Sequence, residues 1–598
     1  MATTPLKTWP ESAARLIAVA AGRAPADLVI RGGRVVLVQT REVLDWEIAV
    51  ADGRFAYVGP DASHCTGEGT EVIDAGGMHV IPGLIDAHMH VESGMLTPAE
   101  FARAVIPHGT TSMMVDPHEI ANVLGLPGVR MMHDEAMGLP INMWVQMPSC
   151  APSAPGLETT GREIGPEDVA EAMRWPGIVG LGEMMNFPGV INGDAKMLAE
   201  MAEAAAAGKT IGGHYASPDL GPPFHAYAAG GPADDHEGTR EEDAVARARQ
   251  GMRAMLRLGS AWYDVKAQIT AVTERGLDAR GFILCTDDCH AGTLVRDGHM
   301  DRVVRHATQC GCDPLVALQM ATINAAEHFG LGREVGSIAP GRRADVVLTR
   351  SLSDIRAERV IARGVTVARG GACEADCPHL DWPAEARATV HLGRPLAAAD
   401  FAVPAPEGAA EVTARVIGVV ENQAPTRALT ARLRVAGGEV IPEGDVARIA
   451  LVERHRGTGG VTNAFVSGFG WRGRMALAST VAHDSHHMIV VGTDAGMMAA
   501  AANRLGEVQG GVTLWAEGEE RALIRLPVTG LMSDAPAAEV AAAADALGEA
   551  MRAAGCTMNN AFMQHSLLAL DVIPELRISD RGLIDVTRFA RAGLLVGA

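Results

Sequence analysis

The sequence of 598 residues has no apolar run of the ~18 residues that a membrane-spanning helix requires. Its N-terminus also lacks the charged start and clean apolar core of a secretory signal peptide, because Pro10 and Glu11 precede a weakly apolar segment. Leu16, Ile17 and Ala20 in that segment have helical spacing and predict a short amphipathic helix. We therefore expect a cytoplasmic protein that makes no membrane contact.

Positive charge is scarce: 51 Lys and Arg stand against 72 Asp and Glu, for a formal net charge of -21. A strongly acidic surface repels nucleic acid and anionic membranes, which argues against both as main partners. The nine cysteines are odd in number and form no CxxC pair. This pattern indicates reduced thiols in a cytosolic protein rather than a disulfide framework.

The length predicts roughly three or four structural units. Short apolar strands with Gly-Gly and Asp-Gly turns occupy residues 26–81, and a similar stretch returns at 336–370. We expect these two stretches to complete one small β-sandwich, with the intervening chain inserted as a separate domain. The predicted units are 1–82 (N-terminal helix and first part of the sandwich), 83–335 (barrel), 336–385 (second part of the sandwich) and 386–598 (C-terminal α+β domain).

The inserted segment alternates strands with helices. Repeated strand–helix units over some 250 residues favour an α/β fold of the (β/α)8 (TIM) barrel type over an open doubly wound sheet. The sixth and seventh strands have weak patterns and are expected near Ala233–His236 and Ala261–Lys266. The clearer candidates are Met78–Ile85, Thr110–Pro117, Ile141–Ser149, Gly177–Met185, Lys209–Ser217 and Gly281–Asp288.

Two histidines, His88 and His90, follow the first of these strands. Alternate residues of a strand point to the same side, so both imidazoles can face one point. Two imidazoles just past the carboxyl end of a strand form half of a metal site.

Polar residues at the ends of later strands provide a second half: Glu183, His214, His236 and Asp287. In a (β/α)8 barrel, chemistry collects at these strand ends. Four imidazoles and two carboxylates suit one or two divalent first-row metal ions, and a bridging carboxylate can hold two ions ~3.5–4 Å apart. Glu237 is placed to orient the neighbouring His236.

Longer motifs identify a family. PGLIDAHMH, the later Glu, His, His and Asp, and ATINAAEHFGL with GSIAPGRRADVVL resemble the amidohydrolase superfamily. DAHMHVESGMLTPAEF, VDPHEIANVLG, GLGEMMN, DDHEG and CTDD more closely resemble its bacterial adenine deaminases. The stretch FVSGFGWRGRMALASTVAHDSHHMIVVGTDAGMMAAAANRL resembles their additional C-terminal domain, so the resemblance covers nearly the whole chain.

This resemblance implies two divalent metal ions per subunit, Mn²⁺ or Fe²⁺, with Zn²⁺ as an alternative. Ureases and dihydroorotases carry a modified lysine at the bridging position, and no lysine occurs in GIVGLGEMMNFPG. The implied ligands are His88, His90 and Asp287 for the more buried ion, His214 and His236 for the second, and Glu183 as the bridge.

The implied reaction is hydrolytic deamination of adenine to hypoxanthine and ammonia, as in purine salvage or catabolism. A metal-bridging hydroxide would attack C6, while Asp287 accepts the water proton and passes it to the departing ammonia. A ring nitrogen must also be protonated, and Glu92, His118 and Glu119 are candidates, with Ser93 as a further substrate contact. The alternatives for these four residues are bracing of a loop and helix capping.

Two other functions are compatible with the sequence. The first is an amidohydrolase that acts on an N6-substituted adenine or on another cyclic amide or amidine. The second is a non-catalytic assembly protein on the same scaffold, which would have lost its metal ligands. We expect a homo-oligomer, with a dimer favoured. The segment VAHDSHHMI, with His483, Asp484, His486 and His487, is either a third metal point or a lid over the active site, or else a structural or subunit contact.

Overall fold

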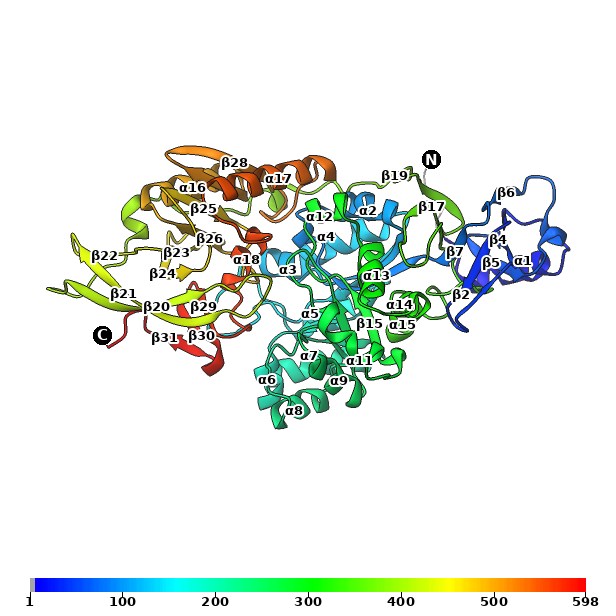
Figure 1. Ribbon diagram of the computed structural model, residues 1–598, viewed down its shortest axis with the longest axis horizontal. Helices are drawn as coiled ribbons and strands as arrows, with labels where there is room; N and C mark the ends of the chain where they lie inside the picture. The colour runs from blue at the N-terminus through cyan, green and yellow to red at the C-terminus, as the bar shows by residue number, and fades with distance from the viewer. Residues whose placement is uncertain (1–5, 598) are drawn as a thin grey trace.

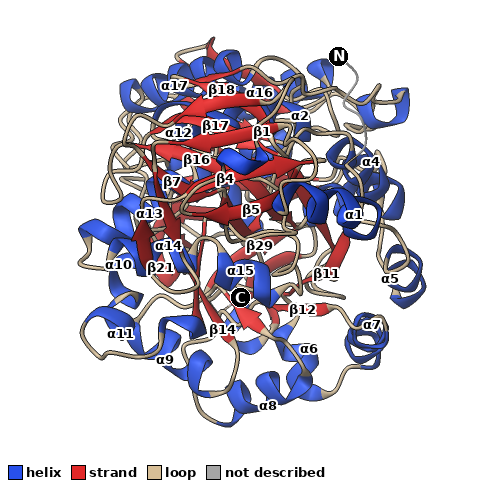
Figure 2. Ribbon diagram, turned by 90° about the vertical axis from the view of Figure 1, so that its right-hand side faces the viewer, coloured by secondary structure: helices blue, strands red, loops and turns tan. Residues whose placement is uncertain are grey.

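The computed structural model describes residues 6–597. Its elements form three groups along the long axis in Figure 1: N-terminal sheets at one end, a barrel in the middle and a C-terminal sheet at the other end. Figure 2 shows helices around the barrel strands. Among the described residues, no helix has both the length and the apolarity to cross a membrane.

The N-terminal group combines two segments that are far apart in sequence. In a seven-stranded sheet, β16 (Val346–Thr349) runs antiparallel to β7 (His79–Pro82), which is parallel to β2 (Arg34–Leu37). The second sheet has four strands, and apolar side chains from both sheets share one core. The predicted N-terminal helix is confirmed as α1 (Trp9–Ala20), which covers the four-stranded sheet and buries Leu16 and Val19, whereas Ile17 is exposed.

The barrel has eight parallel strands. Two parallel sheets, of five and three strands, join through hydrogen bonds at both seams: Ala233 N donates to Ile211 O at 2.8 Å, and Asp287 N donates to His88 O at 3.0 Å. The strands are β8 (Leu84–Met89), β9 (Thr110–Val115), β10 (Asn142–Met147), β11 (Ile178–Met184), β12 (Thr210–Gly213), β13 (Asp234–Asp235), β14 (Arg253–Arg257) and β15 (Phe282–Cys285).

Two strand predictions were wrong. The seventh strand is β14 rather than Ala261–Lys266, whose last residues begin helix α10 (Val265–Gln268). Its pattern is weak because Arg253 and Arg257 enclose only three apolar residues. The single strand Met78–Ile85 is also two strands, β7 and β8, which belong to different sheets.

Gly83 is the point at which the chain passes from one sheet to the other. Its N–H donates to Asp345 O at 2.9 Å, whereas the N–H of Leu84 donates to Gly109 O at 3.0 Å in the barrel. A Cβ at Gly83 would lie 2.0 Å from Thr111 Oγ1. The close approach of the two layers therefore requires glycine.

The C-terminal group is built on a nine-stranded sheet, with α16 (Ala495–Val508) against β25 (Met475–Ser479) and α17 (Ala537–Ala553) against β28 (Glu519–Arg525). A three-stranded sheet of β29 (Leu576–Ser579), β30 (Gly582–Asp585) and β31 (Ala590–Ala592) completes it. One cluster of buried apolar side chains runs from the barrel into this group. The two parts therefore share a core, which holds the C-terminal group firmly over the barrel.

We predict that Gly83→Ala lowers the free energy of unfolding by about 1–3 kcal/mol, because the added methyl overpacks the junction. The melting temperature measures the effect. Gly548→Ala is the matched control: it lies inside α17 with only ordinary contacts around a Cβ, and should be neutral or slightly stabilising. Equal melting temperatures for Gly83→Ala and the unmodified protein would contradict the prediction.

Candidate metal centre

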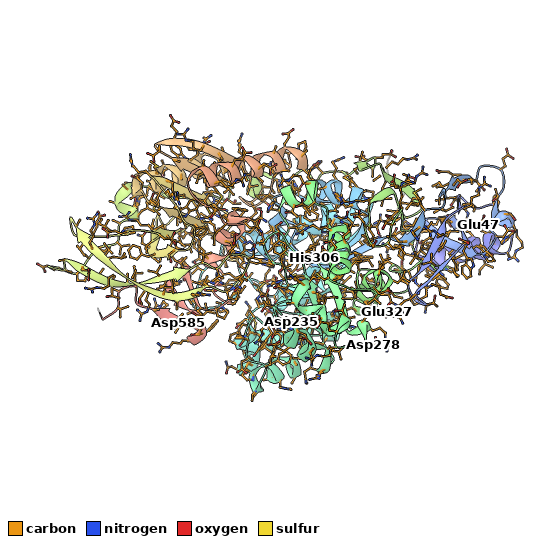
Figure 3. The ribbon with its side chains drawn as sticks, viewed as in Figure 1. Glu47, Asp235, Asp278, His306, Glu327 and Asp585 are labelled. Carbon is orange, nitrogen blue, oxygen red and sulfur yellow. The ribbon has the colours of Figure 1, made fainter. Side chains whose placement is uncertain are left out.

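The six side chains predicted as metal ligands lie together at the carboxyl ends of the barrel strands, and all six are buried. Parallel strands end at one rim of a barrel, so residues distant in sequence meet there. Asp235, which precedes one of them, lies between Glu47 of the N-terminal sheets and Asp585 of the C-terminal group in Figure 3. The six are His88 in β8, His90 just after β8, Glu183 in β11, His214 just after β12, His236 just after β13 and Asp287 two residues after β15.

Glu183 lies at the centre of this cluster. Its Oε1 is 3.3 Å from His90 Nε2 and 3.9 Å from His88 Nε2. Its Oε2 is 3.1 Å from His236 Nε2 and contacts His214 Nδ1. Oε1 is also 3.3 Å from His118 Nδ1, so this oxygen faces three imidazoles, whereas Oε2 faces two.

Asp287 lies beside His88 and His90, two of the histidines that face Oε1 of Glu183. Its Oδ1 is 3.3 Å from His90 Nε2 and 3.8 Å from His88 Nε2. Burial alone would raise the pKa of Asp287, but hydrogen bonding to His90 and the charges of His236 and Arg257 hold it well below its usual range. The side chain is therefore an ionised acceptor.

The cluster fits divalent metal ions. The ligating atoms of His88, His90 and Glu183 lie within 4.8 Å of one another, as do those of Glu183, His214 and His236. The Nε2 atom of His88, which is the ring nitrogen nearest to Glu183 and Asp287, is buried without a hydrogen-bond partner among the described residues. Imidazole nitrogens gathered around a shared carboxylate are the donor set that first-row divalent ions take.

The charge state of Glu183 agrees with this use. Burial alone would raise its pKa, but the imidazoles of His214 and His236 hold it well below the usual range. The carboxylate is thus ionised and able to bind a cation.

Asp116, at the end of β9, orients two members of the cluster. Its backbone oxygen is 2.9 Å from His90 Nδ1, and its Oδ2 accepts a hydrogen bond of 2.8 Å from Glu183 N. A Cβ at Gly182 would lie only 2.2 Å from that Oδ2. The glycine before Glu183 therefore lets Asp116 approach the strand.

Arg257 is a residue of this site that the sequence reasoning missed. It lies in β14, is 2% exposed, and donates to Asp287 Oδ2 at 2.8 Å and to Asp264 Oδ2 at 2.7 Å. Arg257 also forms an ion pair with Glu237. Glu237 is 3.6 Å from His236 Nε2, so its stronger contact is with the arginine. The missed signal was the Arg at the end of RAMLR, at the rim where catalytic side chains collect.

The four predicted substrate contacts divide into two sets. His118, the first residue of α3 (His118–Leu124), lines the cavity at the metal cluster, whereas Glu92, Ser93 and Glu119 do not. Ser93 Oγ lies 2.8 Å from Glu119 Oε1 and also contacts Asp288, and Glu92 accepts from a backbone N–H of α3. Burial and the nearby Glu119 raise the pKa of Glu92 to about 8. These three residues are buried beside one another, next to α3, and do not line the cavity.

The C-terminal group covers the open end of the barrel, with α18 (Ala561–Ser566) near α3 in Figure 1. Asp484 Oδ1 is 3.3 Å from His118 Nε2, so the two groups of elements meet at the cavity. His487 lies away from it, 3.8 Å from Asp580. The C-terminal residues that line the cavity are Ala424, His483, Asp484, Leu567, Leu570 and Ile573.

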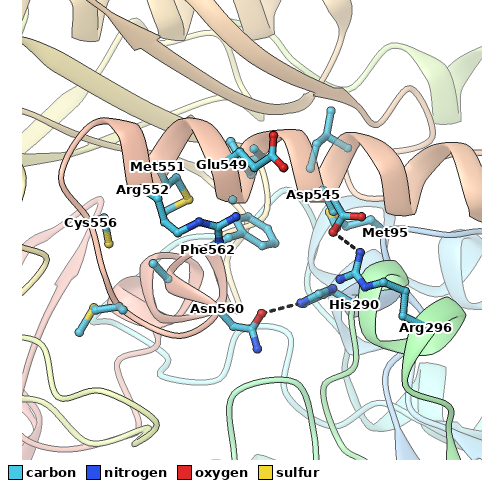
Figure 4. Close-up of a pocket in the computed structure, with 16 residues that line it drawn as sticks. Met95, His290, Arg296, Asp545, Glu549, Met551, Arg552, Cys556, Asn560 and Phe562 are labelled. Carbon is cyan, nitrogen blue, oxygen red and sulfur yellow. Dashed lines mark hydrogen bonds and ion pairs between the residues drawn. The ribbon is translucent and has the colours of Figure 1, made fainter.

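A second cavity lies between α17, α18 and α12 (Ala291–Arg296), as Figure 4 shows. Two pairs of its polar side chains contact each other: His290 Nε2 is 3.0 Å from Asn560 Oδ1, and Arg296 pairs with Asp545. These contacts join the barrel to the C-terminal group.

Comparisons with known proteins match both parts of the chain. The model of the amidohydrolase family matches residues 79–222 and 239–369, and that of the adenine deaminase C-terminal domain matches residues 423–590. The "Adenine deaminase 1" of Jannaschia sp. is 72% identical over 98% of this chain and 99% of its own. The adenine deaminase of Moorella thermoacetica is 47% identical over 97% and 98%. A solved β-aspartyl dipeptidase of Fervidobacterium islandicum AW-1 covers 58% of this chain and 98% of its own, with 16% identity and a TM-score of 0.45.

We predict that Arg257→Met destabilises the protein by about 3–5 kcal/mol, because it leaves the carboxylates of Glu237, Asp264 and Asp287 without their buried counter-charge. Thermal unfolding measures the loss. Arg280→Met removes an exposed ion pair with Asp278 and should leave the melting temperature almost unchanged. A similar effect in both variants would refute the role given to Arg257.

Proposed function

The chain belongs to the adenine deaminase family of the amidohydrolases, and we propose that it hydrolyses adenine to hypoxanthine and ammonia. The observation that carries this proposal is a match over the full length: 72% identity extends through the barrel and the C-terminal group alike. The buried cluster of four imidazoles and two carboxylates supports a hydrolysis that depends on metal.

We assign the six clustered side chains to two divalent ions, with Glu183 shared between His88, His90 and Asp287 on one side and His214 and His236 on the other. Ions held there would lower the pKa of a water molecule toward neutrality and so supply the nucleophile. Mn²⁺ or Fe²⁺ is proposed, with Zn²⁺ as the alternative, because imidazole and carboxylate ligands accept all three.

Asp287 is the group that we assign to proton transfer. Its Oδ2 is held by Arg257 at 2.8 Å, which directs Oδ1 toward the imidazoles and the cavity. It accepts a proton from water as oxygen bonds to C6 of adenine. When the C6–N6 bond breaks, Asp287 returns the proton to the leaving nitrogen, which departs as ammonia. The ring then carries oxygen at C6, as in hypoxanthine.

The cavity combines the polar metal cluster with apolar side chains. Trp262, Leu567, Leu570 and Ile573 are among the apolar residues that line it. Apolar side chains can pack against the faces of a planar heterocycle while polar groups meet its edge. We further propose that the protein acts in the cytoplasm as a homo-oligomer, with a dimer favoured; light scattering after size-exclusion chromatography tests the latter.

We predict that protein loaded with Mn²⁺ releases ammonia from adenine and that chelation abolishes this activity. The substrate alternatives are tested in the same assay with 6-methyladenine, guanine, cytosine and hydantoins. Turnover of one of these in preference to adenine would replace the proposed substrate. No turnover of any compound with metal loaded would remove the proposal.

We predict that Asp287→Asn keeps most of the bound metal but lowers kcat by about 10²–10⁴-fold, because the amide cannot accept and return the proton. Elemental analysis and the ammonia assay measure the two effects separately. Retained deaminase activity would contradict the proton-transfer role.

A further inference from the structure

We propose that His483, from the C-terminal group, contacts the substrate directly and donates a hydrogen bond from Nε2 to a ring nitrogen of the purine. The proposal rests on the proposed function of the metal site and adds a specificity-determining residue from outside the barrel. The first observation is position: His483 lines the same cavity as His90, Glu183 and Asp287.

The second observation is the orientation of the imidazole. Nδ1 of His483 is 3.5 Å from Glu119 Oε1 and 3.7 Å from Asp484 Oδ1. The ring therefore turns one nitrogen toward these carboxylates. Nε2, on the other side of the ring, is buried and has no hydrogen-bond partner among residues 6–597. Buried polar atoms nearly always have a partner, so a ligand in the cavity is the expected one.

The third observation is that the segment around His483 is held in place. The N–H of His483 donates to Ser566 O at 2.9 Å, and that of His486 donates to Ala482 O at 2.8 Å. The buried guanidinium of Arg454 donates to the carbonyl oxygens of His486 and Thr529. A donor fixed in this way before the substrate binds loses little freedom on binding.

The charge of the ring supports a donor role. Burial alone would lower the pKa of His483, but the carboxylates of Glu119 and Asp484 outweigh burial and raise it to about 9. At neutral pH both ring nitrogens then carry a proton. A cationic donor also favours the negative charge that gathers on the ring nitrogens as C6 becomes tetrahedral.

Glu119 and Asp484 are positioning residues in this arrangement. Asp484 Oδ1 also lies 3.3 Å from Nε2 of His118, so one carboxylate orients two imidazoles, one from the barrel and one from its own segment. This explains how the C-terminal group takes part in the site without supplying any of the six proposed metal ligands.

Two substitutions distinguish the roles of the two ring nitrogens of His483. His483→Gln places an amide N–H near the position of Nε2, whereas His483→Asn places it near Nδ1. We expect His483→Asn to lower kcat/KM for adenine and to raise the inhibition constant of hypoxanthine, each by about 10–100-fold. For His483→Gln, the loss in kcat/KM and the rise in the inhibition constant should each be at least fivefold smaller than for His483→Asn. Equal losses in the two variants, or a larger loss for His483→Gln, would overturn the proposal. If the contact of Nδ1 with Glu119 were the important one, His483→Asn would be the less impaired variant.

His487→Gln is the matched control in the same segment. It places an amide near Nε2, the nitrogen that contacts Thr159 and Asp580 outside the cavity, and kcat/KM should stay within about threefold of the unmodified protein. Metal content and melting temperature are measured for every variant. Turnover of adenine by the unmodified, Mn²⁺-loaded protein is required first, so failure of the proposed function is recognised separately.

A second measurement does not depend on the folding of the Gln variant. The inhibition constants of 1-, 3- and 7-deazaadenine are compared in the unmodified protein and in His483→Asn. The ring nitrogen that His483 contacts should be the one whose loss weakens binding to the unmodified protein but not to the variant. Equal losses in both proteins for all three compounds would overturn the proposal.

Discussion

The structure depends on the seam where the first and last barrel strands meet. Asp287 N donates to His88 O at 3.0 Å, and His90 N lies 3.4 Å from Asp287 O. Nearby, the backbone N–H of Thr286 donates to Asp86 Oδ1 at 3.1 Å. These bonds close the barrel and place Asp287 beside two histidines that lie about 200 residues earlier in the chain. His88, His90 and Asp287, which we assign to one metal ion, come together only because this seam is closed.

Charge balance is the second constraint. Several carboxylates and imidazoles are buried within a few ångströms of one another, and each is stable there only because an opposite charge or a hydrogen bond compensates the loss of water. Arg257 compensates Asp287 and Glu237, the imidazoles compensate Glu183, and Glu119 compensates His483. The C-terminal group covers the cavity and excludes solvent, which strengthens these interactions.

Much of this organisation was predictable from local patterns. Strands β9 to β12 and β15 read as apolar runs, and polar residues that follow such runs reach the rim of the barrel. The position of β14 was predicted wrongly because only three apolar residues stand between its two arginines. For the same reason Arg257 was not predicted as a residue of the site. The break at Gly83 was missed because β7 and β8 form one continuous apolar pattern, and only their partners separate them.

The sequence by itself determined the barrel, the shared sheet of its two flanking segments and the set of residues that could bind metal, because these follow from periodicity, turn residues and motifs. Only the tertiary structure decided which side chains stand around the cavity. Glu92 and Ser93 come soon after the HMH motif but do not line the cavity, while His483, nearly 400 residues later, does. The physical reason is that a side chain's neighbours across a closed barrel and a shared core come from non-local packing, on which nearness in sequence has little bearing.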